Sequence, residues 1–130
     1  MRFLCAKFAL MASLGLAACA PMIPASPAHL VLSQPSTATN RIQFQFEVPI
    51  KLDTGYTRTL RDKSIWSRIG QVPQGDVYHP VGTIFTIEGR QVHEAYLVVK
   101  DRQLVGFYLP GEEHYSPLST AVPLTFGEVE

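Results

Sequence analysis

Residues 92–109 decide the fold and read VHEAYLVVKDRQLVGFYL. Two runs rich in β-branched and aromatic residues, 92–99 and 104–109, flank the polar residues 100–103. Two such runs around a short polar segment are typical of an antiparallel hairpin. Both faces are apolar in the second half of each run, so we expect the hairpin at the centre of a sheet or in the closure of a barrel. The alternative is a short buried helix over 92–99, which the β-branched residues at its end disfavour.

Strand patterns continue on both sides of this hairpin. Residues 42–48 alternate apolar and polar side chains, which predicts a strand with one buried face. Pro49 confines that strand to an edge or a bulge, and the segments 53–55 and 73–76 are turn signals. The sequence therefore predicts an all-β domain over 41–130, a small antiparallel β-sandwich or barrel of about six to eight short strands.

Composition and charge limit the partners of this domain. The chain has 130 residues, of which 46% are hydrophobic and 17% charged, and eleven basic residues balance eleven acidic ones. Binding to a phosphate backbone depends on a surplus of Lys and Arg, so no nucleic-acid partner is expected. Residues 41–68 carry a net positive charge and residues 69–130 a net negative charge. If strands from the two halves lie side by side, these charges pair with one another. A basic face for lipid headgroups or lipopolysaccharide is the alternative.

The first eighteen residues, 1–18, have the order of a secretory signal peptide. Arg2 and Lys7 carry positive charge, and 8–16 is an uncharged, mostly apolar run. This run is about half the length of roughly 20 residues that a transmembrane helix needs. We therefore expect export without a membrane-spanning helix.

Leu16-Ala17-Ala18-Cys19 ends this signal and resembles the lipobox of bacterial lipoproteins, which is Leu, two small residues and Cys. Small side chains let a signal peptidase close around the bond before Cys19, and the Cys19 thiol can carry a diacylglycerol thioether. The resemblance implies cleavage between Ala18 and Cys19, followed by acylation of the new amino group with a chain such as palmitate. Two or three acyl chains anchor a protein stably to a membrane.

The same resemblance implies a location. In lipoproteins of enteric-type bacteria, Asp after the lipidated Cys favours the inner membrane, whereas other residues allow transfer to the outer membrane. Ala20 stands at that position. We expect a lipid-anchored protein of the outer membrane that faces the periplasm, provided that the cell has two membranes. Cys5 lies in the segment to be removed, so the mature chain would hold no free thiol, which suits an oxidising periplasm.

Residues 19–40 read as the lipidated Cys and a flexible, proline-rich tether. From residue 20 to 40 the chain carries no charge, and four prolines interrupt any helix or central strand. At about 3 Å per residue, an extended polyproline segment of this length reaches on the order of 60 Å. The alternative is that Leu30-Val31-Leu32 forms a short strand that docks on the domain and shortens the tether.

Histidines and carboxylates supply the only candidates for metal chemistry. His93, Glu94 and His114 are ligand types that bind zinc, and a hairpin could bring their segments together. No HExxH or other metal-site spacing is present. We therefore expect no cofactor, no metal and no catalytic residue, and keep a small metal-assisted hydrolase using these three residues as an alternative.

Aromatic residues supply a second alternative. An exposed groove of aromatic rings would make a module for peptidoglycan or another glycan, although core filling is the commoner use. The candidates are Tyr56, Trp66, Tyr78, Tyr96, Tyr108 and Tyr115. A domain of this size without a polar constellation has more room for an interface of about 800 Å² per partner than for a preorganised active site. The expected function is therefore binding, as an accessory or structural component of an envelope assembly with an envelope protein as partner.

Overall fold

The computed structural model describes residues 21–34 and 40–129, which form antiparallel β-structure without a helix. The expected all-β class is confirmed. Thirteen strands lie in this part of the chain, more than the six to eight expected. The number is higher partly because breaks at Ala95 and at residues 45–47 each divide an expected run, and partly because two of the strands have only two residues each. Within the same described ranges, no helix is long and apolar enough to span a bilayer.

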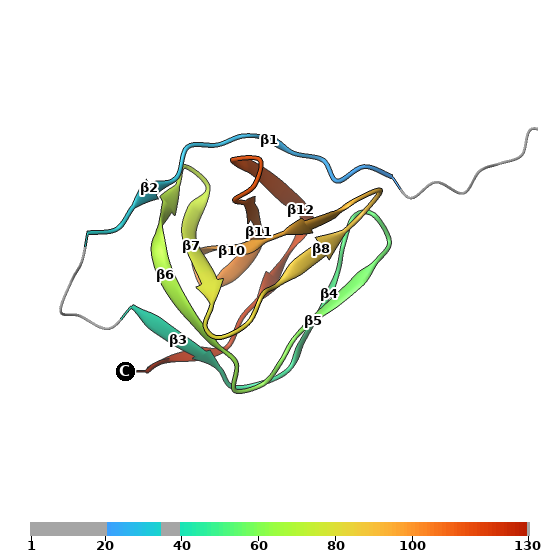
Figure 1. Cartoon of the computed structure of the whole chain (residues 1–130). Helices are drawn as coiled ribbons and strands as arrows, with labels where there is room; N and C mark the ends of the chain where they lie inside the picture. Colours follow the sequence, from blue (N-terminus) through green and yellow to red (C-terminus); the bar gives the residue numbers. More distant parts are fainter. Residues whose placement is uncertain (1–20, 35–39, 130) are drawn as a thin grey trace, which may run out of the picture.

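The main sheet contains nine strands, shown in Figure 1. Their order is β1 (Ser26–Pro27), β12 (His114–Pro123), β11 (Gln103–Leu109), β10 (Tyr96–Lys100), β7 (Gly75–Pro80), β6 (Ile65–Val72), β3 (Arg41–Phe44) and β13 (Phe126–Val129), with β2 (Val31–Leu32) on β6. Two separate hairpins complete the fold. They are β4 (Val48–Lys51) with β5 (Thr57–Leu60), and β8 (Thr86–Glu88) with β9 (Val92–Glu94).

The expected hairpin lies at the centre of the main sheet. β10 and β11 pair down to Lys100 and Gln103, and β7 and β12 flank them. The turn consists of Asp101 and Arg102, whose φ angles are 52° and 59°. Two consecutive positive φ angles match the twist of the strands that a two-residue turn joins. Only the second part of the first run, β10, pairs with β11. The residues before Ala95 form β9, which pairs with β8 instead.

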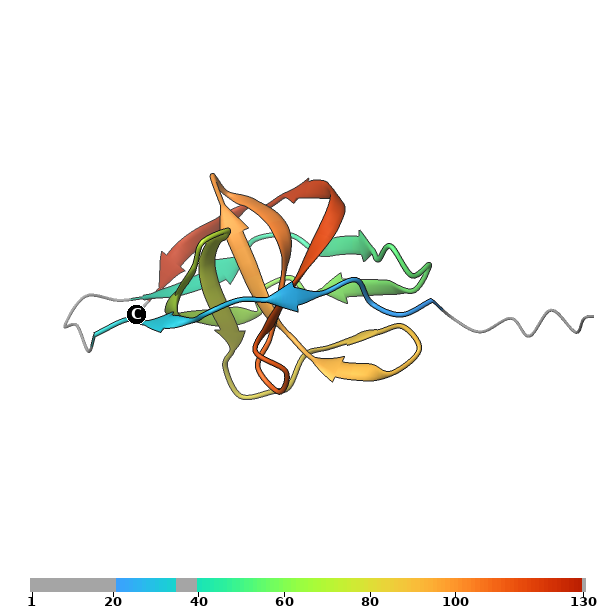
Figure 2. The same ribbon diagram turned by 90° about the horizontal axis from the view of Figure 1, so that it is seen from above.

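Residues 21–34, which we call the strap, close the main sheet into a ring. β1 pairs with β12 and β2 pairs with β6, the two outer members of the consecutive strands β12, β11, β10, β7 and β6. Figures 1 and 2 show the strap running from one to the other. The sequence left open whether this segment is a free tether or carries a short docked strand. In its described part, the strand Val31–Leu32 is docked on β6. Residues 21–34 belong to the domain instead of forming a free linker.

The larger apolar core lies on one face of the central hairpin. Leu97 and Phe107 both lie in this core, because they are opposite each other in the β10–β11 pair and so share a face of the sheet. The hairpins β4–β5 and β8–β9 cover it with Ile50, Leu60 and Ile87, all of which are buried. Pro49 lies in this two-stranded β4–β5 sheet, as its lack of a backbone donor requires.

A smaller core lies on the opposite face of the sheet, under the strap. Val98 and Tyr115 are buried there, and Ala28 and Leu30 of the strap pack against them. The strap approaches β6 closely at Gly70, where a Cβ atom would lie 2.2 Å from the backbone oxygen of Val31. Only a residue without a side chain leaves room for the strap at this place.

Candidate functional site: a cleft beside the strap

A cleft of about 370 Å³ opens where the strap meets the rest of the domain. Three segments form it: the start of the strap, the β8–β9 turn with β9, and the loop between β11 and β12. One part of its wall is apolar (Met22, Ile23, Ala25 and Leu109) and the other is polar (Arg90, Gln91, His93, Glu112 and His114). This size and mixture fit a small binding site, since such sites hold roughly 300–1,000 Å³ and combine apolar walls with a few polar groups.

The start of the strap is fixed to the β8–β9 turn. The backbone N–H of Arg90 donates a hydrogen bond of 3.1 Å to the backbone oxygen of Pro21. Gly89 makes room for this contact, because a Cβ atom there would lie 2.8 Å from Cγ1 of Ile23 and 2.9 Å from the Pro21 oxygen. The turn and the strap therefore hold the cleft in a defined shape.

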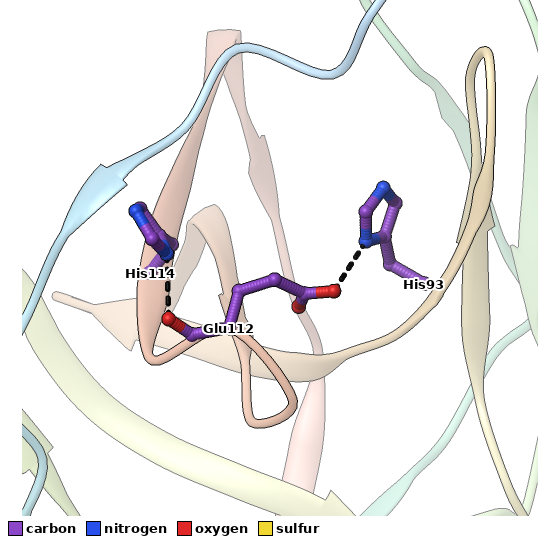
Figure 3. A network of polar contacts seen from close by, with 3 residues as sticks. All are labelled: His93, Glu112 and His114. Atoms are coloured by element: carbon purple, nitrogen blue, oxygen red, sulfur yellow. Dashed lines mark hydrogen bonds and ion pairs between the residues drawn. The ribbon is translucent and has the colours of Figure 1, made fainter.

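Glu112 connects the two histidines of the cleft (Figure 3). Nδ1 of His93 lies 2.8 Å from Oε1 of Glu112, and Nδ1 of His114 lies 2.6 Å from the backbone oxygen of Glu112. A carbonyl or an ionised carboxylate only accepts, so both rings donate from Nδ1, and Nε2 of each neutral ring remains an acceptor. The side chains of His93 and Glu112 are 18% and 41% exposed, so water screens this pair.

The set of His93, Glu94 and His114, which the alternative of a metal-assisted hydrolase required, does not come together in the structure. The two histidines line one cleft, but Glu94 is exposed and does not line it. Neighbouring residues of a strand point to opposite sides, which separates the Glu94 carboxylate from the His93 ring. Across the described ranges, no group of three His, Cys, Asp or Glu side chains could hold a metal ion. The carboxylate beside His93 is Glu112 instead.

The aromatic candidates do not share one groove. Trp66, Tyr108 and Tyr115 are buried, the first in the larger core and the other two in the smaller one. Tyr78 and Tyr96 are half-buried, whereas Tyr56 is exposed on the β4–β5 turn. Most of these rings fill the two cores, which is the commoner use of such residues.

Burial also determines the chemistry of the tyrosines. The hydroxyl of Tyr115 donates a hydrogen bond of 3.0 Å to the backbone oxygen of Val105. Burial raises the pKa of Tyr115 above its ordinary value, because it disfavours the phenolate. For Tyr96, burial raises the pKa first and the nearby charge of Glu94 raises it further. The pKa values of Tyr78 and Tyr108 are also raised, with burial again the largest cause.

The predicted lipidation site lies outside the described residues. This applies to Cys19 and to the recognition residues Leu16, Ala17 and Ala18. Sequence reasoning missed Met22 and Arg90, which come together only because the strap is docked. The only signal for the docking in the sequence was the apolar run Leu30-Val31-Leu32 within the otherwise proline-rich segment. Comparisons with protein-family models, curated proteins and solved structures give no match to this chain.

Proposed function

We propose that the mature chain is a lipoprotein anchored through Cys19 to the outer membrane and facing the periplasm. Its β domain acts by binding, as an accessory or structural component of an envelope assembly. The observation that carries the anchor is the Leu16-Ala17-Ala18-Cys19 sequence behind a charged start and an apolar run. Acyl chains on Cys19 would hold the protein at the membrane.

The cleft beside the strap supports a binding role. It combines an apolar wall with five polar side chains from two other segments. An anchored domain also has a raised effective concentration toward partners on the same membrane. We propose the side of this cleft that Glu112 and His114 form as the surface that binds an envelope protein.

The anchor is tested with cysteine variants of the full chain expressed in its natural host. Mass spectrometry of the native protein is expected to find an N-terminal Cys19 that carries diacylglycerol and an additional acyl chain. The Cys19→Ser variant is expected to lose both and to leave the membrane fraction. Cys5→Ser is the matched control and is expected to behave as the native protein, because Cys5 is removed with the signal. An unmodified Cys19 with residues 1–18 still attached contradicts the proposal.

Binding is tested by site-specific photo-crosslinking in intact envelopes. A crosslinking side chain is placed at Glu112, on the β11–β12 side of the cleft, or at Glu128, which is exposed on β13. We expect one protein to be captured in stoichiometric amount from position 112 and much less of it from position 128. Equal capture from both positions contradicts the assignment of the cleft, and recovery of glycan alone contradicts a protein partner.

A further inference from the structure

The distance between Cys19 and the folded domain is short. Cys19 precedes Pro21 by two residues, and two extended residues span at most about 7 Å. Pro21 itself is held at the β8–β9 turn by the Arg90 hydrogen bond and by the gap that Gly89 provides. A lipidated Cys19 would therefore be separated by a single residue, Ala20, from a residue that this turn holds.

This end of the domain has the chemistry of a membrane-interface surface. Met22 and Val92 are 65% and 66% exposed, although both are large and apolar. Arg90, two residues before Val92, is also exposed. Within the described part of the chain its side chain takes part in no hydrogen bond or ion pair. Apolar side chains enter the boundary between headgroups and acyl chains, and a guanidinium group binds a phosphate through paired donors.

The β4–β5 turn adds a tyrosine to the same end. The hydroxyl of Thr54 donates a hydrogen bond of 2.7 Å to the backbone oxygen of Glu88, which joins this turn to the β8–β9 hairpin. Tyr56, on the β4–β5 turn, is 41% exposed. Both views show the two turns at the end where the strap begins, and the C-terminus at the opposite end (Figures 1 and 2).

The geometry points to this end of the domain as a surface that lies on the phospholipid bilayer. Met22 and Val92 enter the headgroup region, Arg90 binds lipid phosphate, and β13 points into the periplasm. The surface suits zwitterionic lipid, because Glu88 and Glu112 near Arg90 leave no excess of positive charge. This inference rests on the proposed lipidation of Cys19.

The test uses the intact lipidated protein in vesicles of phosphatidylethanolamine and phosphatidylcholine. A fluorescent thiol label is attached to Gln91→Cys or, as the matched control, to Glu128→Cys. Processing removes Cys5 and acylation consumes Cys19, so the introduced thiol is the only one available. Brominated lipid is expected to quench the label at position 91 at least about twofold more than the label at position 128.

Two variants show whether the contact depends on the named groups. Gly89→Val displaces Pro21 and Ile23 from the turn and is expected to abolish the difference in quenching while the protein still floats with the vesicles. The pair Met22→Ser and Val92→Ser leaves the strap in place and is expected to reduce the difference as well. Thermal unfolding of each variant verifies that it is folded.

The outcomes separate this inference from the proposed function. If the protein floats with the vesicles but the label at position 91 is quenched no more than that at 128, the bilayer contact is refuted and the anchor stands. If the protein without introduced thiols reacts with the label and does not float, Cys19 is free. That result overturns the anchor and the bilayer contact together.

Discussion

Replacement of Gly70 by alanine tests the closure of the ring by the strap. A Cβ atom at this position would lie 2.2 Å from the backbone oxygen of Val31 and 3.0 Å from Cα of Leu32. Both atoms belong to the backbone, so no rotation of a side chain relieves the clash. The Gly70→Ala variant must either strain β6 or push β2 away from it.

The magnitude follows from what the strap would lose. The N–H of Ser33 donates a hydrogen bond of 2.8 Å to the oxygen of Ile69, and Nη1 of Arg68 donates one of 2.9 Å to Oγ of Ser33. Each such bond contributes about 1 kcal/mol net. Overpacking at a well-packed site costs a similar amount, about 1–3 kcal/mol. We expect Gly70→Ala to lower the free energy of unfolding by about 2 kcal/mol, which for a domain of this size lowers Tm by about 8 °C.

The assay is thermal and urea unfolding of the chain without residues 1–19, together with amide hydrogen exchange. The matched control is Gly127→Ala, because a Cβ atom there has its nearest contact at 3.4 Å, on the flexible side chain of Gln45. This control is expected to stay within about 0.5 kcal/mol of the native protein. The reasoning is refuted if both variants unfold at the same temperature and the Ser33 amide stays protected in Gly70→Ala.

The other predictions concern the core, the cleft and the tyrosines. Leu97→Ala, at a fully buried position, is expected to lower the free energy of unfolding by about 2–5 kcal/mol in urea titrations, whereas Leu32→Ala, at a residue 69% exposed, should change it by less than about 0.5 kcal/mol. Glu112→Gln breaks a screened contact and should cost less than about 1 kcal/mol by the same measurement, with Glu94→Gln as the control; a loss of several kcal/mol would show that the contact is more important than its exposure implies. The four tyrosines with raised pKa lose their protons more readily in the unfolded chain, so the stability that they contribute is complete below pH of about 10 and is lost as the pH rises through their folded pKa values. Urea midpoints measured against pH, with phenolate absorbance, check this, and a midpoint that rises above pH of about 10 contradicts it.

The central hairpin was predictable because its signal is local. Its strand-prone runs and the polar segment between them lie within eighteen consecutive residues, and the period of two identifies their faces. Alternation could also have removed the metal-assisted alternative, since His93 and Glu94 are neighbours on one strand and face opposite sides. That argument needed only the assignment of the strand.

The strap was less predictable because its reasons lie far along the chain. Proline-rich, uncharged sequence is equally typical of a free linker. Docking depends on the gap at Gly70 and on a second apolar face that exists only after the sheet has formed. For the same reason the cleft could not be assembled from motifs, since its three walls meet only in the folded domain.

The strap also orders the events of folding. Ser26 pairs with Tyr115, so the earliest synthesised part of the domain waits for one of the last. Contacts between residues so distant in sequence form slowly, because a long loop must be closed first. In the proposed export, the strap would cross the membrane before β12, so the two could pair only after nearly all of the chain has emerged. We therefore expect this pairing to be a late step of folding.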